Sequence, residues 1–199
     1  MTALTKDRKK TMDKKKVLVV VDVQNDFVKG GALAYGYPVE SNTEDICAYA
    51  KKVLEAGHYV VATRDSHGDN YLETLEGQML PVPHCISGTR GWGLVDGLQK
   101  LTYTSNFPSV INKHTFGSFA LKDCLERLEF FNSDIDSIEL CGYCTSICVT
   151  ACAVILRAAF PDKRITVLQN LCGDIDEESH LAALKVLKNQ QIEIAYGLQ

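Results

Sequence analysis

The sequence predicts a single α/β domain built on a doubly wound, mostly parallel β-sheet. Residues 17–23 (VLVVVDV) are almost all β-branched, which is typical of a central parallel strand buried on both faces. Strand-like segments then alternate with helix-like segments along the chain, which is the pattern of a parallel sheet with helical crossovers. The 199 residues are 46% apolar, which is enough for one substantial core.

The first part of the chain contains two strands and one helix before a long connection. Val17–Val23 is the first strand. The sequence SNTE at 41–44 is a capping box, which predicts a helix that runs to about Ala56 and is ended by Gly57. The second strand is expected at His58–Thr63.

Residues 68–108 form a long connection between the second and third strands. The connection holds three of the five prolines of the chain and a short helix near Leu94 to Leu98. Connections of this length inside a compact domain are usually functional.

The second part continues the alternation. Ser109–Lys113 is a short strand, and Ser118 is placed to cap a helix that runs to about Phe131. The remaining elements are strands at Ile135–Cys141, Arg164–Leu168 and Gln191–Ala195, and helices that begin at Ser146 and span Asp176–Asn189.

The domain is expected to span residues 16–199 after a basic leader at 1–15. Lys6–Lys16 has seven basic residues against two acidic ones and no apolar face, which indicates a solvated, disordered segment. Met12 within it is as credible a start as Met1.

Composition argues against several classes of protein. The net charge of −4 gives no reason to expect nucleic acid as a partner. No apolar run reaches the roughly 18 residues that a membrane span needs, so no membrane partner is expected. Eight cysteines without a signal-peptide pattern indicate a reducing compartment, and a cytoplasmic location is expected.

Polar side chains follow the carboxyl ends of the predicted strands. Asp22 lies near the end of the first strand, and Asp65 and His67 follow the second. Lys113 ends the third strand, and Cys148 follows the fourth. Ligands of doubly wound sheets bind beyond these ends. A thiol, a carboxylate and an ammonium that meet there can serve as nucleophile, base and pKa-lowering cation.

Cys148 is expected in the first turn of a helix, with Thr145 as the N-cap. Unpaired N–H groups and the positive end of the helix dipole favour a thiolate at this position. A lone cysteine there would more often be a buried helix residue. The matching positions of Asp22 and Lys113 favour catalysis instead.

Asp65, His67 and His84 form a candidate metal site. They supply oxygen and nitrogen ligands for a divalent ion with open coordination positions. The structural alternative is a salt bridge between Asp65 and His67 in a loop, with His84 as an ordinary turn residue.

The cysteines around the fourth strand allow a competing interpretation. Cys141 and Cys144 form a C-x-x-C, and with Cys148 and Cys152 they could indicate redox or zinc chemistry. A thioredoxin-like site needs its first cysteine at a helix N-terminus, whereas Cys141 ends a strand. Cys152 is expected to face the core, so this interpretation is a remote alternative.

Three motifs resemble those of the isochorismatase-like cysteine hydrolases, the nicotinamidase superfamily. The motifs are VDVQNDF (21–27) with GGAL (30–33), NKHTF (112–116) and GYCTSICV (142–149). The resemblance covers essentially Val17 to the C-terminus. It implies the three-layer α/β/α fold of this superfamily, with a six-stranded sheet.

The resemblance also implies the roles of individual residues. Asp22, Lys113 and Cys148 would form a catalytic triad. The Tyr143–Cys144 peptide would be cis, and the backbone N–H groups of Cys144 and Cys148 would form an oxyanion hole. The implied reaction is hydrolysis of a small amide through a thioester on Cys148, with Asp22 transferring protons and Lys113 stabilising anions.

The family further implies that the metal site holds zinc, manganese or iron, which binds the pyridine nitrogen of the substrate. Its ligands would be Asp65, His67 and His84. The family generally supplies one more ligand between the two histidines, for which Glu76 is the first candidate and Glu73 the second.

Aromatic residues near the motifs are candidate walls for a flat ring, although each could be ordinary core. They are Phe27, Trp92 and Tyr143, with Phe116 a weaker candidate.

The favoured substrate is nicotinamide, which would give nicotinate and ammonia. One alternative is a metal-independent hydrolase of the same family that acts on an N-carbamoyl or ureido compound. The remote alternative is a thiol-redox or zinc-binding protein without hydrolase activity. The expected partner is therefore a small-molecule amide, and assembly as a homodimer or homotetramer is expected by analogy with the family.

Overall fold

The computed structural model describes residues 14–38, 42–132 and 135–197. Most of the expected leader, both candidate starts and Ser41 of the expected capping box lie outside these residues. Within them, no helix is long and apolar enough to cross a membrane.

Six strands form one sheet in the order β3-β2-β1-β4-β5-β6, and every neighbouring pair is parallel. The strands are β1 (Lys15–Val21), β2 (Tyr59–Asp65), β3 (Ser109–Lys113), β4 (Ile135–Tyr143), β5 (Arg164–Gly173) and β6 (Glu193–Ala195). The predicted doubly wound sheet is confirmed. Because the chain winds outward in opposite directions from β1 and β4, the gap between these strands is the topological switch point where ligands bind.

The central strand β1 has the environment that its composition predicts. Its residues Val17 to Val21 are all 0% exposed, since β2 and β4 flank them in the sheet and helices cover both faces. The strand ends at Val21 rather than at Val23. Asp22 has a φ of 51°, a conformation that a strand cannot contain.

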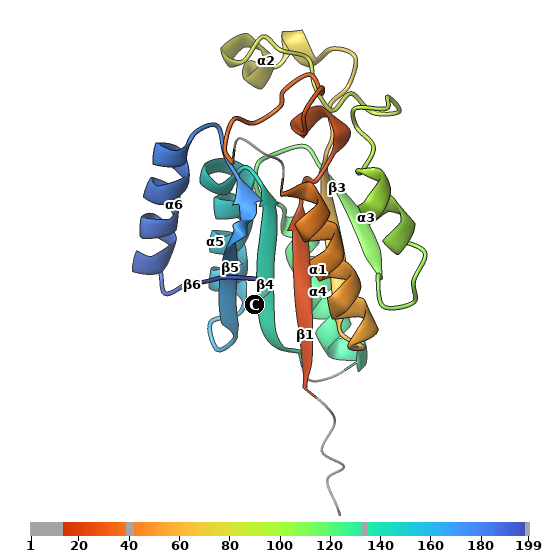
Figure 1. The fold of residues 1–199 in the computed structure, drawn as a ribbon, viewed down its shortest axis with the longest axis vertical. Helices are drawn as coiled ribbons and strands as arrows, with labels where there is room; N and C mark the ends of the chain where they lie inside the picture. Colours follow the sequence, from red (N-terminus) through yellow and green to blue (C-terminus); the bar gives the residue numbers. More distant parts are fainter. Residues whose placement is uncertain (1–13, 39–41, 133–134, 198–199) are drawn as a thin grey trace, which may run out of the picture.

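The helices form two groups. α1 (Thr43–Glu55) packs against α3 (Asp96–Leu101), whereas α5 (Thr150–Ala159) contacts both α4 (Phe119–Asn132) and α6 (Glu177–Asn189). The two groups cover opposite faces of the sheet (Figure 1), which gives the three expected layers. The strands β1 to β4 end at the side of the molecule where α2 (Leu75–Met79) lies (Figure 1).

Two predicted helix starts are confirmed. The Ser118 hydroxyl accepts a hydrogen bond from the Leu121 N–H at 3.1 Å, and Asp176 accepts one from the Ser179 N–H at 2.7 Å. At α1, Asn42 precedes the helix but makes no capping bond. Its amide instead donates to carbonyls at the end of β5, so it joins helix to sheet.

The long connection contains short helices that hydrophobic periodicity does not reveal. They are η2 (Tyr71–Glu73) and α2, and a similar turn, η1 (Asn25–Phe27), follows β1. Three to five residues are too few to display a helical period.

Gly142 is required where β4 passes the end of β1. Its φ is +117°, and a Cβ there would lie 2.0 Å from the carbonyl oxygen of Val21. We expect Gly142→Ala to lower the free energy of unfolding by roughly 4 kcal/mol or more, measured by urea denaturation. Gly30 is the control, because its φ is +91° but nothing lies within 4 Å of an added Cβ. Gly30→Ala should lower the free energy of unfolding only by the cost of the backbone conformation, about 1–3 kcal/mol. Equal losses in Gly142→Ala and Gly30→Ala would rule out the clash at Gly142.

Candidate active site and metal centre

Asp22, Lys113 and Cys148 meet at the switch point of the sheet. Asp22 follows β1, Lys113 ends β3, and Cys148 lies in a π-helical segment, Thr145–Val149, between β4 and α5. The Lys113 side chain reaches across the end of β2. Its Nζ lies 2.7 Å from Asp22 Oδ2 and 3.3 Å from Cys148 Sγ. The structure therefore gathers the predicted nucleophile, base and cation into one buried cluster.

The Asp22 carboxylate is oriented by β2. Oδ1 accepts a hydrogen bond from the Thr63 hydroxyl at 2.7 Å, and the Asp22 N–H donates back to the same hydroxyl at 3.2 Å. Oδ2 lies in the ion pair with Lys113 and has no other hydrogen-bond partner among the residues that the structure describes. This oxygen therefore has a lone pair with which it can accept a proton.

Burial controls the proton affinities of the acid and the thiol. It raises the pKa of the Asp22 carboxyl above its ordinary value, although the charge of Lys113 opposes the shift. Burial and the Asp22 charge also raise the pKa of the Cys148 thiol well above its ordinary value. Burial therefore acts against the thiolate that the helix start favours. A protonated thiol beside a carboxylate of raised basicity is instead arranged for proton transfer on demand.

Lys113 stays charged in this buried position. Burial acts to lower its pKa, but the negative charges of Asp22 and Asp65 raise the pKa well above the ordinary lysine value. Its Nζ also lies 3.3 Å from Asp65 Oδ1. The ammonium is thus a fixed positive charge between two carboxylates and the thiol.

One peptide bond in the turn before Cys148 has the geometry that the family resemblance implies. The Tyr143–Cys144 bond is cis, as predicted. Thr145 is not the N-cap that the sequence indicated, since Cys144 occupies that position. The Thr145 hydroxyl lies 2.8 Å from His180 Nδ1 and donates to the Gly173 carbonyl at 3.2 Å. It therefore joins the turn to β5 and α6.

Four side chains beside the triad form a group that can hold a metal ion. They are Asp65, His67, Glu76 and His84. Two come from the end of β2, one from α2 and one from the loop after α2. Each offers one ligand atom, and these four atoms all lie within 4.8 Å of one another. Asp65 Oδ2 lies 2.9 Å from His67 Nε2 and 3.5 Å from His84 Nε2. Two imidazole nitrogens and two carboxylate oxygens fit a divalent ion such as zinc, manganese or iron.

The structure brings Glu76 to this group. Its Oε1 lies 3.7 Å from His67 Nε2 and 4.0 Å from His84 Nε2. The alternative, Glu73, is absent from the group of potential ligands among the described residues. The short helix α2 places Glu76 over the two histidines, which the sequence could not indicate.

The surroundings of His84 orient it as a ligand. Its Nδ1 lies 2.8 Å from the Val82 carbonyl, so a proton on Nδ1 leaves the Nε2 lone pair directed at the group. The next residue, Cys85, donates its N–H to Asp26 Oδ2 at 2.7 Å. Asp26, from the first motif, thereby fixes the loop that carries His84.

Asp65 is common to both clusters. Oδ1 contacts Lys113, and Oδ2 contacts His67. Burial acts to raise its pKa, but hydrogen bonds from His67 and His84 and the charge of Lys113 outweigh burial and hold the pKa far below the ordinary range. A permanently charged carboxylate thus joins the triad to the metal group.

The predicted pocket walls differ in their surroundings. The Phe27 ring lies 5.6 Å from that of His84 and so beside the metal group. The Trp92 indole donates to the Ser66 hydroxyl at 2.7 Å, and the Arg64 guanidinium stacks on its ring at 3.4 Å. Contact with a substrate remains a prediction for both.

Two other candidate walls are at opposite extremes of exposure. Tyr143 is 1% exposed, with its ring 4.1 Å from that of Tyr35 and its hydroxyl donating to Asn42. Phe116 is 50% exposed. These surroundings give Tyr143 a packing role, and its contact with substrate remains a prediction.

All eight cysteines are free. Cys141 and Cys152 are buried among apolar residues, as the packing interpretation predicted. The metal group found among the described residues contains no cysteine.

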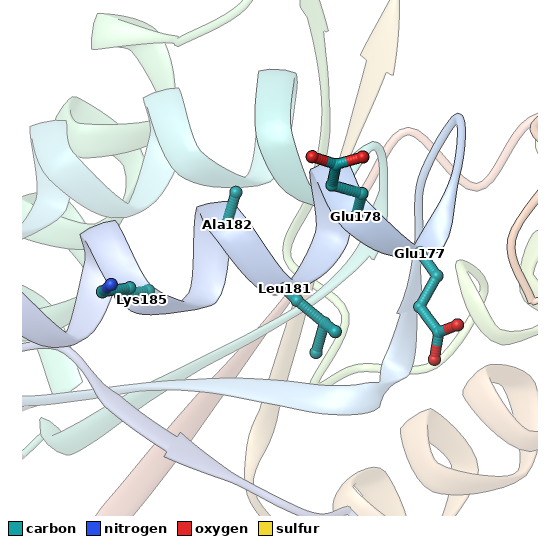
Figure 2. Close-up of a pocket in the computed structure, with 5 residues that line it drawn as sticks. All are labelled: Glu177, Glu178, Leu181, Ala182 and Lys185. Atoms are coloured by element: carbon teal, nitrogen blue, oxygen red, sulfur yellow. The ribbon is translucent and has the colours of Figure 1, made fainter.

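A hollow on the outer side of α6 is separate from this site. Its lining residues are Glu177, Glu178, Leu181, Ala182 and Lys185 (Figure 2). None of them belongs to the triad or to the metal group, so the hollow does not compete as the reactive centre.

Residues missed at the sequence level have supporting roles. Thr63 orients Asp22, and Asp26 ties down the loop of His84. Asp26 stands within the first motif, which is a usable signal. Thr63 ends a predicted strand and looks like an ordinary β-branched strand residue.

Comparisons with known proteins agree with this geometry. The sequence profile of the isochorismatase domain matches residues 16–195. A nicotinamidase/pyrazinamidase of Mycobacterium tuberculosis is 28% identical over 193 residues, which cover 90% of this chain and 97% of the relative.

Solved structures give the same result. The nicotinamidase of Bacillus subtilis superposes with a TM-score of 0.77 at 31% identity, covering 91% of this chain and 99% of the other. The pyrazinamidase of Pyrococcus horikoshii, solved in complex with zinc, gives 0.71 at 25% identity, covering 92% and 99%. From its motifs, its fold and these matches, the chain belongs to the isochorismatase family.

Proposed function

We propose that this protein is an amidohydrolase that converts nicotinamide to nicotinate and ammonia. The observation that carries the proposal is the Asp65 carboxylate, which contacts the Lys113 ammonium with one oxygen and the histidine pair with the other. A ring nitrogen bound at the metal group would hold its substrate next to the thiol. The curated relative and the solved structures named above include nicotinamidases, which supports the same substrate.

The reaction begins with proton transfer from the Cys148 thiol to Asp22 Oδ2. The sulfur then attacks the amide carbon, and the carbonyl π electrons move onto oxygen. We assign the backbone N–H groups of Cys144 and Cys148 to this oxyanion, with Lys113 as the nearby positive charge. Asp22 next protonates the amide nitrogen, the C–N bond breaks, and ammonia departs. The acyl group remains on Cys148 as a thioester.

Hydrolysis of the thioester uses the same carboxylate. Asp22 takes a proton from water, the hydroxide attacks the carbonyl carbon, and the C–S bond breaks. The acid is released, and Asp22 returns its proton to the sulfur. General acid–base assistance of this kind is typically worth about 10²–10⁴-fold in rate.

Asp65, His67, Glu76 and His84 would hold the metal. When bound, a divalent ion supplies a Lewis-acidic site for the pyridine nitrogen of the substrate. The four side chains would fix its position relative to Cys148, and Asp65 would in turn fix Lys113.

The direct test is ammonia release over a substrate panel: nicotinamide, pyrazinamide, N-carbamoyl compounds and ureido acids, each with and without zinc, manganese or iron. We expect nicotinamide and pyrazinamide to be cleaved in a metal-dependent manner. Cleavage of only the N-carbamoyl or ureido compounds, unaffected by metal, would favour the alternative family activity and reject the proposed substrate.

Removal of the metal gives a separate prediction. Dialysis against a chelator should lower nicotinamide turnover by roughly 100-fold or more, because the substrate loses its anchor, and added metal should restore it. Glu76→Gln should weaken metal affinity by about 10–100-fold, measured by metal titration. Glu73→Gln is the matched control and should bind metal like the parent. If Glu76→Gln also bound like the parent, Glu76 would not be a ligand.

Assembly and location stay predictions. The eight free cysteines support a reducing compartment, and we propose the cytoplasm. Light scattering on the purified chain would test the proposed homodimer or homotetramer.

A further inference from the structure

A buried carboxylate outside the triad accepts hydrogen bonds from the segment that contains the proposed nucleophile. Asp174 follows β5 directly and is 0% exposed. Its Oδ2 accepts a hydrogen bond from the Ser146 N–H at 2.7 Å, and its Oδ1 accepts one from the Ser146 hydroxyl at 2.7 Å. Ser146 stands midway between Cys144 and Cys148, the two residues whose N–H groups we assign to the oxyanion.

The carboxylate itself is fixed in place. The Asp174 N–H donates to the Tyr37 carbonyl at 2.7 Å, and its own carbonyl accepts the N–H groups of Tyr37 at 2.9 Å and Gly36 at 3.1 Å. Oδ1 also accepts the Ile175 N–H at 2.8 Å. Backbone bonds on both sides therefore give Asp174 a rigid base from which to hold Ser146.

No lysine or arginine within the described ranges forms an ion pair with Asp174. A buried carboxylate without a cation depends on the hydrogen bonds that it accepts, and these are charge-assisted and short. Two of the three side-chain contacts go to Ser146. The neighbouring Thr145 is also tied to this connection, through the Gly173 carbonyl.

We propose that Asp174 is a positioning residue that sets the Cys144–Cys148 segment in the geometry needed for attack and for oxyanion binding. The inference rests on the proposed function of Cys148. Asp174 belongs to neither the metal group nor the triad, so it acts through Ser146. Displacement of a reacting group by about 1 Å can lower a rate by about 100-fold.

The test is steady-state kinetics of the metal-loaded, full-length protein. Asp174→Ala should lower kcat for nicotinamide by about 10–100-fold while KM changes by less than about three-fold, since substrate binding is left intact. Asp174→Asn, which keeps the shape and one acceptor oxygen, should lose less. In the Asp174→Ala background, Ser146→Ala should cause no further loss, because the two residues share one interaction.

Asp176→Ala is the matched control. Asp176 lies two residues further along and caps α6 through the Ser179 N–H, without contact to Ser146. Its replacement should lower the urea midpoint but leave kcat unchanged. A fall in kcat for Asp176→Ala equal to that for Asp174→Ala would overturn the proposal, because the effect would then be general loosening of the connection. An Asp174→Ala loss confined to KM would overturn it as well.

Two further results separate the positioning role of Asp174 from the proposed reaction. If Asp174→Ala and Asp174→Asn both keep full kcat while Cys148→Ala is inactive, the positioning role is rejected and the function stands. If the parent protein releases no ammonia from nicotinamide, the function fails. The rate of Cys148 alkylation by iodoacetamide would then still test whether Asp174 positions the thiol, and an unchanged rate in Asp174→Ala would reject that role.

Discussion

Replacement of Cys148 with alanine is expected to abolish amide hydrolysis. Without the sulfur there is no nucleophile for the carbonyl carbon, and removal of a nucleophile from a comparable triad lowers kcat by roughly 10⁶-fold. Metal content and the cooperativity of urea unfolding should be retained, because the smaller side chain removes one buried sulfur and no charge. The measurement is ammonia release at saturating nicotinamide.

Cys152→Ala is the control for this loss. Cys152 is also a buried cysteine of the same helical stretch, and its sulfur approaches the Phe116 carbonyl at 3.8 Å rather than Lys113. The Cys152→Ala variant should be less stable, because the lost sulfur leaves a cavity, but its kcat should stay within about two-fold of the parent. Equal activity in Cys148→Ala and the parent would reject the enzyme mechanism as a whole.

Replacement of Asp22 with asparagine should have the second largest effect. The amide keeps the shape of the carboxylate but cannot accept the thiol proton, so kcat should fall by about 10²–10⁴-fold. The reactivity of Cys148 should change in the opposite direction. Burial raises the pKa of the thiol and the charge of Asp22 raises it further, so removal of that charge should lower the pKa relative to the parent, with Lys113 acting in the same direction.

Alkylation by iodoacetamide at neutral pH should therefore become faster in Asp22→Asn while amide turnover becomes slower. Asp136→Asn, at an exposed ion pair with Lys14, should change neither rate. If alkylation and turnover both slowed in Asp22→Asn, the loss would be one of structure rather than of a base.

The same carboxylate sets an expected pH dependence. Asp22 must be ionised to accept the thiol proton, and burial raises its pKa above the ordinary value. The acid limb of kcat/KM should accordingly lie above the ordinary aspartate pKa of about 3.9, with activity falling as the pH drops through it. The limb should be absent from the residual activity of Asp22→Asn.

The sheet and the triad could be predicted because their signals are local. The β-branched run at 17–23 identifies the central strand, and the alternation of elements fixes parallel strands whose carboxyl ends share an edge. Asp22, Lys113 and Cys148 could be grouped from chain direction alone. In the structure, both Asp22 and Cys148 are in contact with Lys113 Nζ.

The metal group was less predictable because it depends on the long connection. Asp65 and His67 are close in sequence, but Glu76 reaches them only through η2 and α2, which are too short to show a period. Asp174 gave no signal at all. Its proposed role depends on a contact with Ser146 between the ends of the neighbouring strands β4 and β5, and no sequence pattern records such a pairing.

The proton state of Cys148 was also beyond the sequence. Position at a helix start favours a thiolate, but the sequence does not show that the thiol is buried in the field of Asp22. Burial and the charge of Asp22 raise the pKa of this thiol and outweigh the opposing effect of Lys113. In the mechanism that we propose, Asp22 generates the nucleophile during the reaction.

The proposed mechanism requires a covalent intermediate on Cys148, which can be trapped during a single turnover. Metal-loaded protein in excess over nicotinamide is quenched in acid over the course of a single turnover, and the cysteine-containing peptides are analysed by mass spectrometry. We expect the mass of one nicotinoyl group to appear on Cys148 and to disappear as nicotinate forms. Nicotinate formation with no nicotinoyl group on Cys148 at any time, or with the group on another cysteine, would rule out a thioester at Cys148.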